Sequence, residues 1–335
     1  MLNNIKKKFV QSLLRPGGWG KLVNLVRFHL AYPQARHVLG GGVNVVHRCN
    51  LRCSFCSCGF NQPENHRPDM PLELFERILD LEAFRHAFYI VTGDGEPLLL
   101  GDFDRYIQAI QRRRKLALVP TNATLLEKRL DTVLKAPPDI MWVSLYEQYE
   151  ERQLAGLGVM QKHKPAGMVL GAAKLITKDN LNDLERIIAA VGGLGVENIF
   201  FQQLMTQAED GEGQAKLIFD HDRDSLATID RARAFARRQF PRMNIFFPHP
   251  VPTGGSKFFC LSLFKGFQVE PNGAIQPCCV LYPDGQDTWG NIFNDPLTHC
   301  RHPAHLALKR SFLNARRIED LMPVCQKCPM LNLKV

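Results

Sequence analysis

Three closely spaced cysteines have the type and spacing that could hold an iron–sulfur cluster. Cys49, Cys53 and Cys56 follow the apolar run 43–47 and are separated by three and then two residues. Three thiolates on one tight loop can ligate three irons of a cubane 4Fe-4S cluster, whereas electron-transfer ferredoxins close the site with a fourth cysteine. The spacing therefore predicts an iron without a protein ligand, open to a small molecule. The alternative is a zinc site or buried free thiols, although zinc sites more often use paired Cys-x2-Cys knuckles.

A second group of cysteines lies toward the C-terminus. Cys260 is followed by Cys278, and a long gap separates both from Cys325 and Cys328. Four thiols suffice to close a 4Fe-4S cluster or a tetrahedral zinc site, and spacing alone does not choose between the metals. Cys279 adjoins Cys278 and could exchange roles with it. The cysteines outside both groups are Cys58 and Cys300.

Short β-rich runs alternate with helical segments between residues 43 and 247, a pattern typical of βα units around a parallel sheet. The expected strands are 43–47, 87–92, 116–121, 140–145, 168–176 and 198–204. The expected helices between them are 71–84, 103–113, 125–134 and 181–191. Six right-handed units of this kind predict an α/β fold, a partial (β/α)6 TIM-like barrel. In such folds the chemistry lies at the carboxyl ends of the strands.

Candidate functional segments follow the first three expected strands. The cysteine loop comes after the first, Thr92–Pro97 (Thr-Gly-Asp-Gly-Glu-Pro) after the second, and Thr121–Thr124 after the third. The carboxyl ends of parallel strands meet at one edge of the sheet, so these segments are expected to lie together. The motifs and the expected topology thus indicate the same site.

The cysteine loop after a first strand, Gly93–Pro97 after a second and the six βα units resemble the radical S-adenosylmethionine (SAM) superfamily over about residues 43–247. The resemblance implies that SAM chelates the open iron through its amino and carboxylate groups. It further implies reductive cleavage of SAM to a 5′-deoxyadenosyl radical, which removes a hydrogen from an organic substrate. The cofactor would supply the chemistry, and the barrel would position SAM and substrate.

The same resemblance implies further SAM contacts. Phe55 would contact adenine, and Ser144 would meet the ribose or carboxylate. The segment expected to receive the amino group consists of Gly93, Asp94, Gly95 and Glu96. The family usually has glycine where this chain has Asp94. Lys174 and the segment Gln202–Leu204 are candidates for carboxylate and adenine contacts, with an ordinary place in the barrel interior as the alternative.

Residues 269–278 and 290–292 resemble the hairpin of SPASM and shortened twitch domains appended to radical SAM enzymes. Pro271–Gly273 is also a turn signal, expected to bring Cys278 to face Cys260. A full SPASM domain has three further cysteines and two auxiliary clusters, but this chain ends seven residues after its last cysteine. The resemblance therefore implies a twitch-type domain with one auxiliary 4Fe-4S cluster. Its expected ligands are Cys260, Cys278, Cys325 and Cys328.

The length of 335 residues allows a large domain and a smaller unit. The expected parts are a basic helical extension (1–40), the radical SAM barrel (41–247) and the auxiliary cluster domain (248–335). The boundary is placed at the Pro- and Gly-rich stretch 248–255. Ten cysteines in a chain of this length, without a signal peptide, favour the cytoplasm over a secreted disulfide scaffold. No apolar run is long enough to span a membrane.

Residues 1–37 are basic and partly amphipathic. The expectation is a helical extension packed on the main domain, and the alternative is a peripheral membrane or protein-partner helix. The net charge of +9 would also suit nucleic acid, but none of the common nucleic-acid-binding motifs is present.

Three hypotheses cover the net reaction. The main one is an oxidoreductase that dehydrogenates a small molecule such as a sugar or cyclitol, which resembles what a twitch-type aminocyclitol dehydrogenase does. The alternative is a maturase that cross-links or epimerises a ribosomally made peptide. A third is a non-catalytic iron–sulfur or zinc protein that binds nucleic acid. Either enzyme would need an electron donor such as flavodoxin or ferredoxin.

Overall fold

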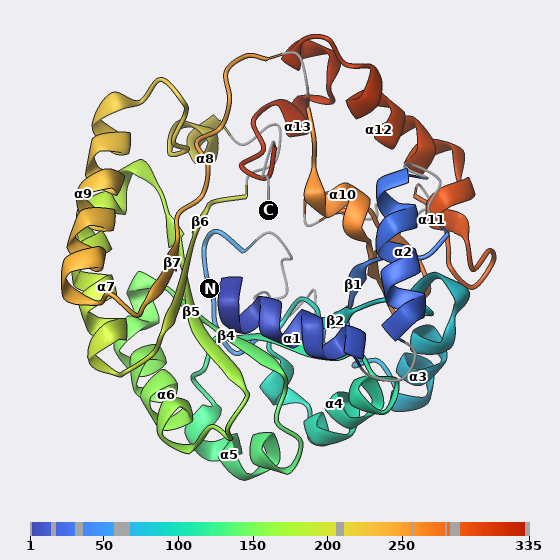
Figure 1. The fold of residues 1–335 in the computed structure, drawn as a ribbon, viewed down its shortest axis with the longest axis horizontal. Coiled ribbons are helices and arrows are strands. Elements are labelled where there is room, and N and C mark those ends of the chain that lie inside the picture. Colours follow the sequence, from blue (N-terminus) through green and yellow to red (C-terminus); the bar gives the residue numbers. More distant parts are fainter. Residues whose placement is uncertain are drawn as a thin grey trace.

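The protein is built around one sheet of nine strands in the order β7-β6-β5-β4-β3-β2-β1-β8-β9. The computed structural model describes residues 2–14, 18–30, 36–56, 68–205, 211–255, 258–278, 280–281 and 289–331. Cys58 and Cys279 fall outside these ranges. All neighbouring strands pair in parallel except β8 and β9, which are antiparallel. The sheet is open and curls into the partial barrel that the sequence predicts (Figure 1).

The strands agree with most of the predicted ones. They are β1 (Gly40–Val43), β2 (Tyr89–Thr92), β3 (Leu116–Thr121), β4 (Ile140–Leu145), β5 (Val169–Ile176), β6 (Asn198–Gln203), β7 (Asn244–Phe246), β8 (Gln268–Val269) and β9 (Ile275–Gln276). Strand β7 and the pairing of β8 with β1 were not expected. Because β8 joins β1, the C-terminal segment extends the sheet of the barrel.

Strand β1 begins three residues before the expected position. Its first three residues are glycines, which are poor strand formers, so propensity favoured the valine-rich run after them. The packing explains the difference. A Cβ on Gly40 would lie 2.3 Å from the Tyr89 ring, and one on Gly42 would lie 2.8 Å from the Gln268 side chain. Glycine lets the neighbouring strands approach β1 closely, and residues 44–49 are left free of regular structure to form a loop.

Helices cover the outer face of the sheet (Figure 1). They are α3 (Leu72–Asp80), α4 (Phe103–Arg112), α5 (Leu126–Lys135), α6 (Glu150–His163), α7 (Leu184–Gly193) and α9 (Arg223–Gln239), with the short α8 (Gly211–Ala215) after β6. Helix α6 was not expected because its two glycines weaken the helical pattern. One of them, Gly156, is required by packing, since its Cβ would lie 2.4 Å from the Ala123 carbonyl oxygen.

The C-terminal segment also forms a small apolar core of its own. It contains α10 (Leu261–Lys265), α11 (Thr298–Arg301), α12 (Pro303–Asn314) and α13 (Pro323–Gln326). Phe258, Phe264, Leu308, Phe312 and Leu321 are buried together there. The division of the chain into three parts at residues 40 and 247 stays a prediction.

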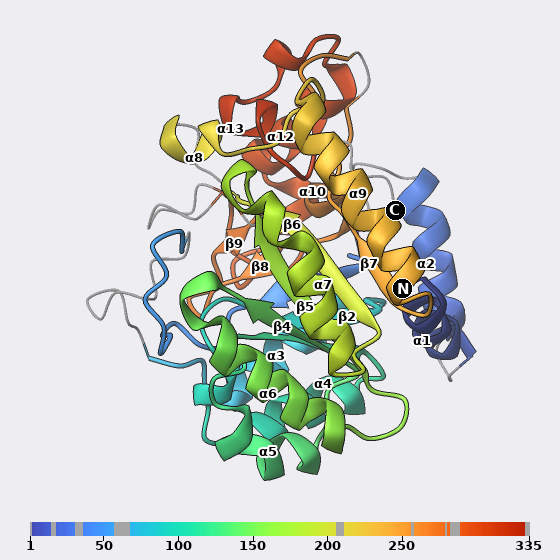
Figure 2. The ribbon, with the colours of Figure 1, turned by 90° about the vertical axis from the view of Figure 1, so that its left-hand side faces the viewer.

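Two N-terminal helices, α1 (Leu2–Leu14) and α2 (Gly18–Leu30), pack at the amino ends of the barrel strands. The Phe9 ring lies 5.4 Å from the ring of Phe88, just before β2. Lys8 Nζ lies 3.2 Å from Asp139 Oδ1, just before β4. Figure 2 places both helices on the side of the barrel opposite the loop that leaves β1. The extension therefore packs on the main domain.

Helix α12 buries a histidine whose titration should make stability fall in acid. His305 is 0 % exposed, and neither ring nitrogen has a hydrogen-bond partner. Burial, helped by Lys309, His299 and His302, lowers its pKa well below the usual value. The unfolded chain binds a proton below about pH 6.5, whereas the folded chain resists it. Stability is therefore retained above that pH and lost as pH falls, by up to about 1.4 kcal/mol per pH unit.

Urea unfolding between pH 7 and pH 5 checks this expectation. His305→Leu should flatten the fall of the unfolding free energy with pH. His163→Gln, at an exposed position of α6, is the matched control and should leave the slope unchanged. Equal slopes for His305→Leu and the parent protein would contradict the assignment.

Candidate functional site

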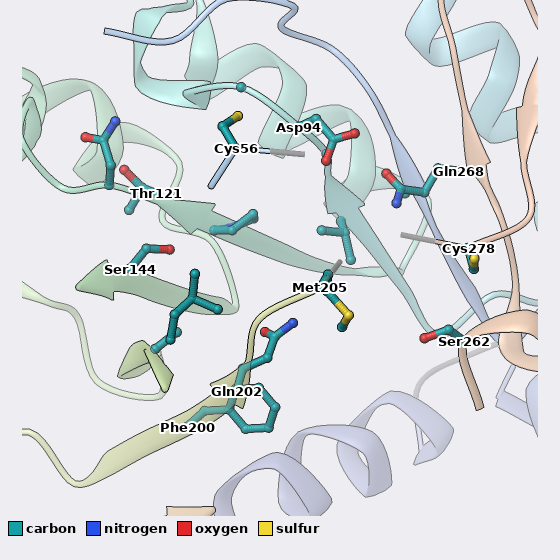
Figure 3. A pocket seen from close by; sticks show the side chains of 18 of the residues that line it. Cys56, Asp94, Thr121, Ser144, Phe200, Gln202, Met205, Ser262, Gln268 and Cys278 are labelled. Atoms are coloured by element: carbon teal, nitrogen blue, oxygen red, sulfur yellow. The ribbon is translucent and has the colours of Figure 1, made fainter. Parts of the chain in front are cut away.

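A cavity of about 580 Å³ lies between the barrel strands and the C-terminal segment. In Figure 3, Thr121 and Ser144 lie on one side of it and Ser262, Gln268 and Cys278 on the other. The predicted SAM-site residues that line it are Cys49, Cys53, Phe55, Cys56, Gly93, Asp94, Gly95, Glu96, Ser144, Lys174 and Leu204. Folding thus brings all of them to one cavity, as the strand-end argument expects.

The three cysteines of the first group are close enough for their charges to interact. Burial, reinforced by Cys49 and Cys56, raises the pKa of the Cys53 thiol to about 11. Donors approach the Cys49 sulfur, namely Leu51 N at 3.5 Å and Asn122 Nδ2 at 3.7 Å. Hydrogen bonds to sulfur are a feature of iron–sulfur sites, so this donor set fits a cluster.

No three His, Cys, Asp or Glu side chains converge on a single metal ion in the described part of the chain. A cubane does not require such convergence, because each cysteine binds a different iron. The placement of Cys49, Cys53 and Cys56 around one cavity wall is compatible with that distribution.

Asn44 fixes the glycine-rich loop after β2. A Cβ on Gly93 would lie 1.7 Å from Asn44 Oδ1, so only glycine fits beside this side chain. Gly95 has a φ of +80°, which favours glycine as well. The backbone N–H of Asp94 donates to Asn44 Oδ1, and Asn44 Nδ2 donates to Asp94 Oδ2, both at 3.2 Å. Asn44 therefore holds Asp94 in place within this loop.

Glu96 joins the loops after β2 and β3. Its buried carboxylate accepts hydrogen bonds from Leu98 N at 3.0 Å, Thr121 Oγ1 at 2.8 Å and Asn122 N at 2.7 Å. Burial raises its pKa, and these hydrogen bonds act in the opposite direction. The backbone N–H of Glu96 also donates to the carbonyl oxygen of Arg48 in the cysteine loop. Glu96 thus organises three loops of the site, and its contact with SAM stays a prediction.

A buried polar network links the C-terminal hairpin to the same loops. Asn44 Nδ2 donates to Glu270 Oε1 at 2.6 Å, and His47 Nε2 lies 3.1 Å from Glu270 Oε2. Asn44, His47 and Glu270 are all less than 9 % exposed. Asn44 and Glu270 were not predicted as partners because they are 226 positions apart and no local sequence pattern pairs them.

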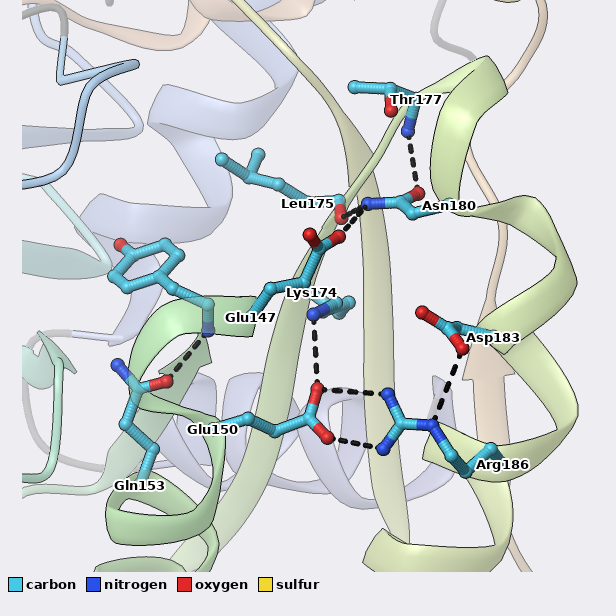
Figure 4. Close-up of polar contacts among 10 residues, drawn as sticks. Glu147, Glu150, Gln153, Lys174, Leu175, Thr177, Asn180, Asp183 and Arg186 are labelled. Atoms are coloured by element: carbon cyan, nitrogen blue, oxygen red, sulfur yellow. Dashed lines mark hydrogen bonds and ion pairs between the residues drawn. The ribbon is translucent and has the colours of Figure 1, made fainter.

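Lys174 lines the cavity, but its ammonium group already has an anionic partner (Figure 4). Lys174 Nζ lies 3.2 Å from Glu150 Oε2, and Glu150 also pairs with Arg186. Burial of Glu150 opposes its ionisation, yet hydrogen bonds from Arg186 and Lys174 outweigh this and lower its pKa. A SAM carboxylate at Lys174 would therefore share the ammonium group with Glu150.

Removing the charge of Glu150 should destabilise the fold. Glu150→Gln leaves the buried Lys174 ammonium without its counter-charge, and we expect a loss of about 2–3 kcal/mol in the free energy of unfolding by urea. Arg186→Gln is the matched control, because that side chain is half exposed and its pair is worth less than about 1 kcal/mol. Equal losses of unfolding free energy in the two variants would show that burial does not make the Glu150–Lys174 pair more important than the exposed Glu150–Arg186 pair.

Phe55 and Ser144 meet at Tyr146, a residue that the sequence analysis did not select. The rings of Phe55 and Tyr146 are 5.1 Å apart. Burial raises the pKa of Tyr146, opposed by its hydrogen bond with Ser144. Side chains alternate between the two faces of a strand, so a residue two positions after Ser144 lies on the same face. This alternation could have identified Tyr146 from the sequence.

The second group of cysteines lines a smaller apolar cavity. Burial raises the pKa of Cys260 to about 11 and that of Cys325 to about 12. Cys278 borders both cavities, as do Ser262 and Met330. The cysteines brought together are Cys260, Cys278, Cys325 and Cys328. Cys300 is separate from them, and its thiol donates to the Leu297 carbonyl oxygen.

None of the helices in the described ranges combines the length and apolar character needed to cross a membrane.

Curated relatives match only part of the chain. One is the tungsten-containing aldehyde ferredoxin oxidoreductase cofactor-modifying protein of Pyrococcus furiosus, with 26% identity over 49% of this chain and 51% of the relative. Another is the PqqA peptide cyclase of Granulibacter bethesdensis, with 26% identity over 45% of this chain and 43% of the relative. The chain thus spans about half the length, or less, of these relatives.

Solved structures share the fold over most of the chain. Streptococcus suis SuiB bound to S-adenosylmethionine has a TM-score of 0.65 at 15% identity and covers 93% of this chain and 76% of its own. SuiB bound to its precursor peptide SuiA has a TM-score of 0.64 at 16% identity, covering 88% and 71%. Residues 43–203 match the model of the radical SAM superfamily. These residues therefore form a radical SAM domain, the kind of domain that binds a 4Fe-4S cluster and SAM.

Proposed function

We propose that this radical SAM enzyme modifies a peptide, removing hydrogen from a side chain placed in the cavity. The observation that carries the proposal is the lining of the cavity beyond the predicted SAM site. Its apolar members include Phe200, Met205, Phe267 and Met330. Such a surface suits an apolar or aromatic side chain, whereas each hydroxyl of a buried polyol needs a polar partner. A peptide substrate is also named for the PqqA relative and for SuiB.

We assign the following roles in SAM binding and hydrogen abstraction to residues of the chain. Cys49, Cys53 and Cys56 would hold the SAM-binding cluster. The loop Gly93–Glu96, kept in place by Asn44, would receive the amino group of SAM. When bound, the cluster and SAM supply a 5′-deoxyadenosyl radical that takes a hydrogen atom from substrate. The barrel would limit the access of water to this reaction, and the Glu96 side chain in the cavity wall is buried.

We also propose an auxiliary 4Fe-4S cluster at the second group of cysteines. Support comes from the four thiols around one apolar cavity and from Cys278, which borders the substrate cavity as well. All four ligands would be cysteine, so this cluster has no open iron for substrate. Its position beside the main cavity suits the transfer of an electron from the substrate, with an external donor such as flavodoxin or ferredoxin supplying the first electron.

Dehydrogenation of a sugar or cyclitol is the second candidate. Gln202, Ser262 and Gln268 give the cavity some polar groups that could bind hydroxyls. These polar side chains are fewer than the apolar ones around them, so this candidate has less support.

Deuterium transfer distinguishes the two candidates. The anaerobically reconstituted protein is given dithionite, SAM and either a peptide digest of perdeuterated bacterial protein or a mixture of perdeuterated sugars and inositols. The peptide proposal expects deuterium in 5′-deoxyadenosine, measured by mass spectrometry, from the first mixture alone. Deuterium from the sugars and inositols alone would overturn it in favour of dehydrogenation.

A further inference from the structure

The two N-terminal helices expose an unusual number of large apolar side chains. The exposed ones are Val10 at 52 %, Leu14 at 81 %, Trp19 at 81 %, Leu22 at 38 %, Val23 at 44 % and Val26 at 49 %. Elsewhere in the described part of the chain, large apolar side chains of comparable exposure are scattered singly, at Phe55, Leu313 and Met322. Single exposed apolar residues are ordinary, whereas a cluster of them marks an interaction surface.

The apolar residues of α2 lie on one side of the helix. Trp19, Leu22, Val23 and Val26 have the spacing i, i+3, i+4 and i+7, which places them in one stripe. Figures 1 and 2 show α1 beside α2, both on the outside of the molecule. We call the six exposed residues of α1 and α2 the apolar face.

The charged residues of the segment that carries this face are all positive. Residues 1–36 contain seven Lys or Arg and no Asp or Glu, and the first acidic residue of the chain is Glu64. Lys8 and Lys21 are directed into the fold, toward Asp139 and the Arg114 carbonyl oxygen. Lys6 and Lys7 are exposed on α1. The surface therefore combines an apolar stripe, an exposed tryptophan and uncompensated cations.

We infer that α1 and α2 dock this protein onto the surface of a bilayer that contains anionic lipids. A helix lying in the membrane interface has this composition, with Trp and aliphatic residues on one face and Lys or Arg nearby. A second copy of the chain fits less well, because two faces without a single acidic residue would bring like charges together. Docking in this way leaves the loop that carries Cys49, Cys53 and Cys56 uncovered, since that loop lies on the opposite side of the barrel (Figure 2).

Vesicle flotation of the full-length, cluster-reconstituted protein tests the inference. We expect it to bind phosphatidylcholine vesicles with 30% phosphatidylserine at least about 10-fold more tightly than pure phosphatidylcholine vesicles, and less tightly as salt is raised. The triple variant Trp19→Ser, Val23→Ser, Val26→Ser should lose most of this binding. Leu313→Ser with Met322→Ser removes exposed apolar residues elsewhere and should retain it. Lys6→Gln with Lys7→Gln should lose about 5-fold per charge on the anionic vesicles.

A second measurement does not depend on disruptive variants. Brominated lipids should quench the fluorescence of the parent protein, and Trp19→Phe should lose this quenching while still floating with vesicles. The inference is overturned if the parent protein does not float with anionic vesicles at low salt, or if the apolar triple variant floats as well as the parent. It is also overturned if the parent forms a dimer that the same triple variant abolishes while vesicle binding is absent.

Discussion

Replacing Cys49, Cys53 and Cys56 together with alanine should abolish the formation of 5′-deoxyadenosine while leaving about four irons per chain. SAM cleavage requires the cluster that these residues would hold, so the rate should fall below detection. The second group of cysteines shares none of its ligands with the first, and its cavity should keep its own cluster. Iron and sulfide counting after anaerobic reconstitution, followed by chromatography of 5′-deoxyadenosine with dithionite as reductant, measures both effects.

The matched control is Cys300→Ala. Cys300 is buried, as are Cys53 and Cys260, but lies outside both cysteine groups, so its loss should leave about eight irons and normal SAM cleavage. The iron content and SAM cleavage of the triple variant also test the two proposed clusters independently. Loss of all iron in the triple variant would remove the auxiliary cluster from the proposal. Continued SAM cleavage in the triple variant would place the SAM site elsewhere.

The positions of several strands are predictable from the sequence because each of these strands coincides with a short apolar run. Strands β3 and β4 begin and end where the apolar, β-branched runs begin and end. The order of strands then places the three loops at one edge. The predicted SAM residues line one cavity there, and their contact with SAM stays a prediction. The spacing of the cysteines, the order of the strands and the fact that parallel strands end at the same edge of the sheet were sufficient to place these residues together.

Long-range packing accounts for what the sequence did not predict. Strand β1 consists largely of glycine, and its position depends on the close approach of Tyr89 and Gln268 from other strands. The pairing of β8 with β1 and the hydrogen bond between Asn44 and Glu270 join parts of the chain that are more than 200 positions apart. Local propensity contains no information on such partners, so these features become visible only in three dimensions.

The loop after β2 gives the second large effect, which Gly93→Ala should reveal. The added methyl group would overlap with Asn44 Oδ1, at 1.7 Å, and Asn44 cannot move without breaking its hydrogen bonds to Asp94 and Glu270. We expect the variant to lose about 2–3 kcal/mol of unfolding free energy and to bind SAM at least about 30-fold more weakly. Urea unfolding and equilibrium dialysis of SAM with the reconstituted protein measure the two quantities.

Gly101→Ala is the matched glycine control, because a Cβ at Gly101 would meet nothing within 4 Å. That variant should keep both stability and SAM affinity within a few tenths of a kcal/mol. Gly93→Ala with unchanged SAM affinity would show that the loop does not form the SAM site.

A double-mutant cycle shows whether the effect passes through Asn44. Asn44→Ala alone should destabilise the protein, because Glu270 and Asp94 lose a buried hydrogen-bond partner. In the Gly93→Ala background the same truncation also removes the clash, so it should cost much less, with a coupling energy of about 1–2 kcal/mol. Strict additivity would mean that the alanine at position 93 acts on the backbone alone. A measured coupling would show that the methyl group at position 93 acts through Asn44, the residue that also hydrogen-bonds Glu270 of the C-terminal hairpin.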